Sequence, residues 1–189
     1  MAAITISRSI AASSEIASAA EIRAAFAEHK QELTWLAEFL SDDELMASAC
    51  VTDARDLMEN NNDEICQECL QMWTREATIR SVLDFKRMRI AELSSMYEHD
   101  DLVGQEHPPM SLQTMEFVVR ESDNVRSRLD CLCRFVLVLC GFAQHSANQA
   151  ALLLGISTHA VEAAYSSALE SLEIIYCQVL VEAAGCAAA

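Results

Sequence analysis

Apolar side chains recur along the chain at intervals of three and four residues, which is the repeat of an α-helix. The first clear series follows Glu21 and consists of Ile22, Phe26, His29, Leu33, Leu36 and Leu40. A helix with this spacing buries one face and leaves the other in water. The pattern therefore predicts helices from residue 21 onward, with His29 in the core or at its rim.

Capping residues divide this pattern into several elements. Ser41 and Glu44 have the spacing of a capping box, which predicts the start of a helix. The three asparagines at 60–62 predict the end of that helix. Further helical patterns cover residues 63–97, 112–119, 125–140, 147–154 and 158–184.

Glycine and proline are scarce, and this bears on the fold class. The chain has 189 residues but only four glycines and two prolines, and none of them precedes Gly104. A β protein of this size needs many tight turns, which usually recruit these two residue types. The sequence therefore predicts an all-α fold.

Both prolines and the first glycine fall in one short acidic stretch, which predicts a linker at residues 99–110. The sequence on either side predicts two helical domains, residues 21–98 and residues 111–189. Residues 1–20 have weak periodicity, and we expect them to form a loose segment.

The chain is strongly acidic, with 13 Lys and Arg against 29 Asp and Glu and a formal net charge of −16. Nucleic-acid binding depends on basic side chains that displace counterions, so the overall field repels DNA and anionic membranes. The apolar run at 135–143 is about half a membrane span. Residues 1–20 lack the basic leader and apolar block of a secretion signal. We therefore expect a cytoplasmic protein with no membrane partner.

Motifs for catalysis and metal binding are sparse. The five histidines are scattered, and the sequence has neither H-E-x-x-H nor a glycine-rich phosphate loop. Cys66 and Cys69 form a C-x-x-C inside a helical pattern, and a C-x-C follows at 131–133, but four converging zinc ligands are not evident. We expect no enzyme, no metal and no cofactor, and interpret the eight cysteines as reduced, small apolar residues. A zinc or redox thiol protein is a third hypothesis.

The most informative segment runs from Ser146 to Leu172. Ser146 and Gln149 form a capping box for a short helix. Gly155 suits a turn with positive φ, and Ser157 can cap a second helix. The inward stripe of that second helix consists of Val161, Ala164, Ala168 and Leu172. Two short helices joined by such a turn form a helix-turn-helix.

This segment resembles region 4 of bacterial sigma factors of the extracytoplasmic-function type. In that family an apolar helix, here residues 130–140, precedes the helix-turn-helix. The family's pattern is supplied here by Ala151, Leu154, Gly155, Ser157, Val161, Ala168, Leu169 and Leu172. The first half of the chain is similar to sigma region 2, and residues 73–87 resemble the helix that reads the −10 promoter element.

The resemblance implies a sigma-factor-like transcription regulator that acts through the RNA polymerase core and promoter DNA, with an anti-sigma factor or another protein as a further partner. It places DNA contacts on the second helix of the motif. The residues expected to face outward there are Thr158, His159, Glu162, Ala163 and Ser166. The resemblance to region 2 adds a basic cluster, which consists of Arg75, Arg80, Lys86, Arg87 and Arg89.

Two features of the charge pattern leave an alternative open. No Lys or Arg follows Arg134, and Glu162 would face a phosphate-lined groove. The alternative is a degenerate sigma-like module that binds protein and has lost DNA binding. A negative surface on the second helix would favour this alternative. A positive collar would favour DNA binding, and its candidate residues are Arg120, Arg126, Arg128 and Arg134.

The basic cluster and Trp73 also admit two interpretations each. The basic side chains either contact the −10 strand or an acidic partner, or pair with acids on their own helix at a spacing of four residues. Trp73 either stacks on a flipped base or packs as an aromatic residue in the core.

Overall fold

The computed structural model describes residues 16–61, 65–98 and 110–186. Within these ranges every regular element is a helix, apart from one isolated bridge between Ile16 and Cys66. The predicted all-α fold is therefore confirmed. Residues 99–109, which carry nearly all of the predicted linker, lie outside the described residues, as do residues 1–15.

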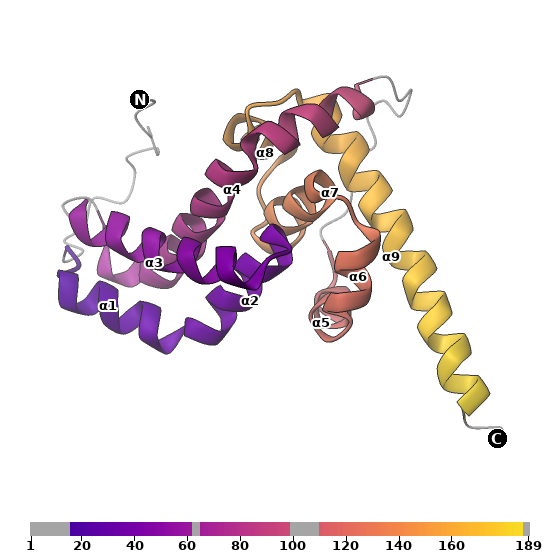
Figure 1. Ribbon diagram of the computed structural model, residues 1–189, viewed down its shortest axis with the longest axis horizontal. Coiled ribbons are helices and arrows are strands. Elements are labelled where there is room, and N and C mark those ends of the chain that lie inside the picture. The colour runs from indigo at the N-terminus through magenta and orange to yellow at the C-terminus, as the bar shows by residue number, and fades with distance from the viewer. Residues whose placement is uncertain (1–15, 62–64, 99–109, 187–189) are drawn as a thin grey trace.

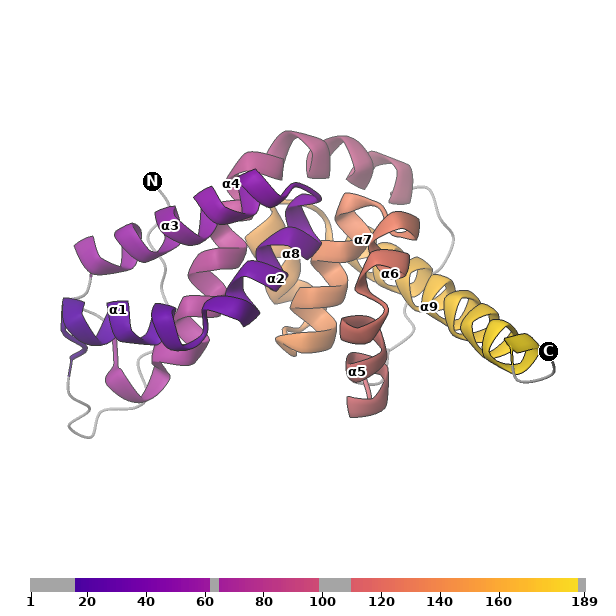
Figure 2. The same cartoon turned by 60° about the horizontal axis from the view of Figure 1, so that its bottom comes forward.

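The N-terminal half, meaning the described residues up to 98, contains α1 (Ala19–Glu28), α2 (Lys30–Ser41), α3 (Glu44–Asn60), the 3-10 turn η2 (Gln67–Cys69) and α4 (Leu70–Tyr97). The C-terminal half, from residue 110, contains α5 (Leu112–Arg120), α6 (Ser122–Arg128), α7 (Cys131–Val136), the π-helical turn η3 (Leu137–Phe142), α8 (Ala147–Leu154) and α9 (Thr158–Cys186). The long helix α4 runs from the first three helices to α8 and α9 (Figure 1). The end of α9 projects away from the other helices (Figures 1 and 2).

Most helix ends follow the capping residues in the sequence, but the start of α3 differs from expectation. Ser41 does not open a helix: it is the last residue of α2, and Asp43 caps α3 by accepting a hydrogen bond from Met46 N at 2.8 Å. The reason is Asp42, whose left-handed backbone (φ 62°) turns the chain between the two helices. The end of α3 at Asn60 agrees with the predicted break.

Residues 16–20 differ from the expectation of a loose segment at residues 1–20. Ala17 is buried, and its N–H donates to Ile65 O at 2.8 Å. Ser18 and Glu21 form a capping box that starts α1 at Ala19. The start of α1 is therefore fixed both by a cap and by a contact with the segment that precedes α4.

The predicted helix over residues 125–140 is divided in the structure. Leu129 is extended, and Asp130 caps the new helix α7 by accepting from Cys133 N at 2.8 Å. The helix then widens into η3, where Ala143 N donates to Val138 O, five residues earlier, at 2.9 Å. A run of apolar residues does not reveal either change, because periodicity records which residues are buried and not the register of backbone hydrogen bonds.

One large hydrophobic core joins the two halves. Its fully buried members include Phe39, Leu40, Val82 and Ile90 from the N-terminal half and Val118, Leu132, Phe135 and Val161 from the C-terminal half. A smaller cluster packs under α1 and comprises Ala17, Ile22, Phe26, Leu33, Ala54, Met58 and Ile65. The two predicted domains are thus in direct contact through shared apolar packing.

Polar and aromatic contacts reinforce this junction. The carboxylate of Asp42 lies 3.3 Å from Arg126 Nε and 3.5 Å from Arg134 Nη1. The hydroxyl of Tyr97, at the end of α4, donates to Asp130 Oδ2 at 2.8 Å. These contacts join the end of α2 to α6 and α7, and the end of α4 to the start of α7.

Candidate functional site

The segment that resembles sigma region 4 folds as two helices joined by a tight turn. Ser146 and Gln149 form the predicted capping box of α8, and Gly155 has the predicted positive φ of 70°. Ser157 Oγ accepts from Ala160 N at 3.1 Å at the start of α9. Across the turn, Thr158 Oγ1 donates to Asn148 Oδ1 at 2.9 Å. Sequence reasoning identified the local geometry of these two helices correctly.

Four of the five residues expected on the outer face of α9 lie there, each half-exposed: Thr158, His159, Glu162 and Ser166. Ser166 uses its hydroxyl to donate to Glu162 O at 2.9 Å. Ala163 was expected beside them, but this expectation is wrong because Ala163 has no exposed surface.

Packing by α4 gives a physical reason for the burial of Ala163. Besides α7 and α8, α9 contacts α4, which crosses it near its start (Figure 1). Ala160 and Ala163 are both fully buried, whereas Ile174 and Gln178, on the same side of α9 further along, are exposed. A second helix covers the first half of α9, so its accessible face is narrower than in an isolated helix-turn-helix.

The accessible face of α9 is acidic and apolar. A line of residues at alternating four- and three-residue steps follows it, and we call this line the acidic strip: Glu162, Ser166, Leu169, Glu173, Tyr176 and Leu180. Glu170 flanks the strip, whereas Glu182 is nine residues beyond Glu173 and so lies on the other side of the helix. Among the described residues, α9 carries four carboxylates and no Lys or Arg. The strip therefore carries the carboxylates of Glu162 and Glu173 with no basic side chain on the same helix.

The arginines that could have formed a positive collar are largely neutralised. Arg134 is 5% exposed and is held by Asp42 and by the carbonyl of Arg126. Arg126 itself pairs with Asp123 at 3.0 Å as well as with Asp42. Arg120 pairs with Glu121 at 3.3 Å, and Arg128 is exposed. Three of these four arginines therefore form ion pairs with acidic side chains of the C-terminal half or with Asp42 at the end of α2.

The predicted basic cluster on α4 does not form one patch. Arg80 pairs with Glu76 at 2.7 Å, which is the i,i+4 pairing considered from the sequence. The other cluster members also have acidic partners: Arg75 with Glu32, Arg87 with Asp84 and Arg89 with Glu92.

Helix geometry separates these side chains further. Arg87 and Arg89 are two residues apart, so they point to different sides of α4. Lys86 is half-buried near the thiols of Cys50 and Cys131, on the side of α4 that faces the core. Trp73 is also half-buried and packs on the smaller hydrophobic cluster, as a core aromatic residue would.

The cysteines differ in exposure, and Cys140, which is half-buried, and Cys177, which is exposed, depart from the expected burial. Cys50, Cys131 and Cys133 are buried, as expected for small apolar residues, and burial raises the pKa of Cys133 to about 12. Cys66 and Cys69 differ from expectation: they precede α4, are half-exposed, and flank the turn η2. In the described ranges no group of three or more His, Cys, Asp or Glu side chains is arranged to hold a metal ion.

A groove between α5 and α9 was not anticipated from the sequence. It encloses about 330 Å³ and is lined by Ser111, Gln113, Thr114, Phe117, Leu169, Leu172, Glu173 and Tyr176. The rings of Phe117 and Tyr176 meet edge to face, with centroids 5.2 Å apart. We call this the α5–α9 groove. Further exposed apolar residues, including Ile174 and Leu180, lie near Tyr176 in the chain.

Comparison with known proteins adds no relative to this picture. No family model matches the chain, and no curated protein matches it. None of the described helices is both long and apolar enough to cross a membrane.

Proposed function

We propose that the chain is a sigma-factor-like regulator of transcription that acts through protein contacts with RNA polymerase, with α9 as a protein-binding helix. The observation that carries this choice is the acidic strip of α9. Its carboxylates lie where a DNA-reading helix needs donors for phosphates and guanine. In the described ranges no Lys or Arg side chain forms an ion pair with a carboxylate of α9.

The α5–α9 groove supports a partner of defined chemistry. Phe117, Leu172 and Tyr176 supply apolar and aromatic surface, and the groove has room for a large apolar side chain. Glu173 lies at the groove and is exposed. A partner segment with an apolar anchor next to Lys or Arg would match both the groove and the charge of the strip.

Binding of the full chain to a bacterial RNA polymerase core tests this proposal. The chain carries a fluorophore at its N-terminus, and anisotropy is titrated with the core enzyme. We expect Glu173→Lys to weaken binding about tenfold, equivalent to about 1.4 kcal/mol. Glu182→Lys makes the same charge change on α9 outside the residues that line the groove, and it should leave the affinity nearly unchanged. Absence of binding, or an equal loss in both variants, would contradict the proposal.

Direct promoter recognition is the second candidate function, and the exposed arginines of α4 favour it. Arg87 and Arg89 are exposed, and their acidic partners are on the surface, where ion pairs are weak. Phosphates could therefore compete for these side chains.

A DNA titration of the full chain at physiological salt separates the two functions. On the protein-contact proposal, affinity for promoter-like duplexes is no better than the weak end of nonspecific binding, about 10⁻⁴ M. Glu162→Arg should raise it, because a guanidinium replaces a repelling carboxylate. Glu182→Arg, far from the turn of the motif, should do so less. Tight, sequence-selective binding by the unchanged protein would establish the second candidate instead.

A further inference from the structure

Cys66 and Cys69 lie in a turn whose geometry suits a disulfide. Cys69 N donates to Cys66 O at 3.1 Å, so the four residues 66–69 form a hydrogen-bonded turn. The Cα atoms at the ends of such a turn are less than about 7 Å apart. Disulfides span Cα separations of about 4.4–6.8 Å. The backbone therefore holds the two cysteines within reach of a covalent link.

The side chains are also in contact and accessible. The Cys69 thiol is hydrogen-bonded to Cys66, and both residues are half-exposed. This combination distinguishes them from Cys50, Cys131 and Cys133, which are buried. Cys177 is exposed but lies on α9, in the other half of the molecule.

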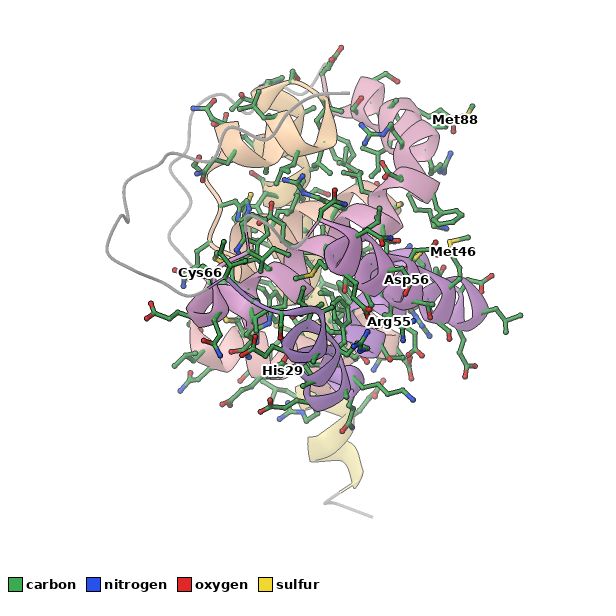
Figure 3. All side chains as sticks on the ribbon, turned by 90° about the vertical axis from the view of Figure 1, so that its left-hand side faces the viewer. His29, Met46, Arg55, Asp56, Cys66 and Met88 are labelled. Atoms are coloured by element: carbon green, nitrogen blue, oxygen red, sulfur yellow. The ribbon has the colours of Figure 1, made fainter. Side chains whose placement is uncertain are left out.

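The turn occupies a junction in the fold. Cys66 forms the antiparallel bridge to Ile16, and the neighbouring Ile65 O accepts from Ala17 N. Cys69 is the N-cap of α4, which begins at Leu70. Figure 3 shows Cys66 on the opposite side of this end of the molecule from Met46 and Met88. A bond across this turn would link the partner strand of the N-terminal segment to the first turn of α4.

We propose that Cys66 and Cys69 form a reversible intramolecular disulfide, with a low-molecular-weight disulfide as the oxidant. One cysteine thiolate attacks a sulfur of the oxidant and releases one thiolate, which leaves a mixed disulfide on the protein. The second cysteine loses its proton and attacks the protein sulfur of that mixed disulfide, releasing the second thiolate. Two protein thiols are oxidised, and the oxidant is reduced to two thiols.

Acidic side chains lie beside the two thiols. Desolvation raises the pKa of the Cys69 thiol, and its hydrogen bond to Cys66 and the charge of Glu68 act in the same direction. Glu21 also lies close, since it accepts from Gln67 Nε2 at 2.5 Å. These carboxylates favour a cationic oxidant over an anionic one.

The test uses the full chain in glutathione buffers of graded oxidised fraction, quenched by acid and alkylated before peptide mass spectrometry. We expect a 66–69 disulfide in the unchanged protein and in Cys177→Ser, while Cys177 itself is still alkylated. Cys66→Ser and Cys69→Ser should each lose the disulfide, and Cys69→Ser should accumulate mixed disulfide on Cys66. Circular dichroism of each variant confirms that the helices are retained.

Two results would overturn the proposal. One is complete alkylation of Cys66 and Cys69 in a buffer that already converts Cys177 to a mixed disulfide. The other is a disulfide that joins either cysteine to a third one. The charge argument has its own measurement: cystamine, a cationic disulfide, should oxidise the pair at least several times faster than oxidised glutathione at low salt. This proposal is independent of the RNA polymerase assay, because neither outcome depends on a protein partner.

Discussion

The two longest described helices, α4 and α9, have nearly equal lengths of 28 and 29 residues. They differ in whether their charged side chains have partners of opposite charge on the same helix. On α4, Arg80, Arg87 and Arg89 pair with acids of the same helix. On α9, the carboxylates have no basic neighbour on their own helix. Most charged side chains of α4 thus form ion pairs within the helix, whereas the carboxylates of α9 have no Lys or Arg partner on their helix. On the proposed function, the protein-binding surface lies on α9, which has fewer charged residues than α4.

Both helices pack against α7, and a buried residue of α7 gives the largest expected effect on stability. Phe135 on α7 is fully buried, and α7 contacts both α4 and α9. Phe135→Ala should cost about 3–5 kcal/mol of unfolding free energy.

Urea unfolding followed by two signals checks this prediction. Both tryptophans lie in the N-terminal half, although the ring centroid of Trp35 is also 6.1 Å from that of Phe142, so their fluorescence reports on that half and on its junction with the substituted half. The fluorescence midpoint should shift together with the circular dichroism midpoint. An unchanged fluorescence transition would mean that the two halves unfold independently and that the shared core is not cooperative.

Neighbouring positions on α9 provide the next test. Because Ala163 has no exposed surface, Ala163→Arg would bury a charge and should destabilise the protein by more than about 2 kcal/mol. Glu162→Arg introduces the same side chain one residue earlier, on the accessible face, and should change stability by less than about 0.5 kcal/mol. Thermal unfolding of the pair measures the difference. Equal stability of the two variants would show that α4 does not cover α9 in solution.

The buried side of α9 also predicts a pH dependence. Cys133 Sγ contacts Ala164 O at 3.4 Å, and burial raises the pKa of Cys140 to about 11 and that of Cys133 to about 12. In the unfolded chain these thiols ionise near pH 8.5. Between about pH 9 and 11 the unfolded state therefore binds fewer protons than the folded state, and stability falls as the pH rises.

Unfolding free energies measured at pH 8, 9, 10 and 11 check the sign of this dependence. Cys140→Ala should make the decline shallower, because one of the two thiols no longer contributes. Cys177→Ala removes an exposed thiol and should leave the slope as it is in the unchanged protein. A steeper decline in Cys140→Ala would be incompatible with a buried, protonated Cys140.

The smallest expected change in stability comes from removing one exposed charged side chain from each of the two helices. Arg89→Ala removes the partner of Glu92 on α4 and should destabilise the protein by about 0.2–0.5 kcal/mol. Glu170→Ala on α9 relieves repulsion from Glu173, three residues away, and should stabilise it by a similar amount. Both differences should shrink in high salt, which screens exposed charges. The same sign for both variants would contradict the contrast between the two helices.

Local signals in the sequence predicted much of this fold. Helical spacing gave the all-α class, and Ser146, Gln149 and Gly155 gave the ends of α8, because capping and positive φ depend on nearby residues. The burial of Ala163 could not be read in the same way. It depends on α4, which is some 70 residues distant in the chain, and a small residue at that position fits either a solvent face or a tight contact.

The candidate binding surfaces differ in the same way, because one depends on nearby residues and the other on residues far apart in the chain. The acidic character of α9 follows directly from the sequence, whereas the α5–α9 groove requires Phe117 and Tyr176 to meet across a gap of nearly sixty residues. The C-x-x-C was expected within a helix because its flanking residues favour helix. Instead, Cys66 is extended and forms the bridge to Ile16, and residues 67–69 form the turn η2, so helix α4 begins only after the second cysteine.

The wide turn η3 has a consequence for how this chain could change length. A π-helical turn accommodates one residue more than the α-helical path between the same two ends. Deleting one residue between Leu137 and Phe142 would let an ordinary α-helical turn close, with the flanking segments in nearly their present orientation. Deleting one residue from the middle of α4 would instead rotate everything beyond the deletion by about 100°. A one-residue deletion in the helical segment just before the helix-turn-helix should therefore disturb the fold less than the same deletion within α4.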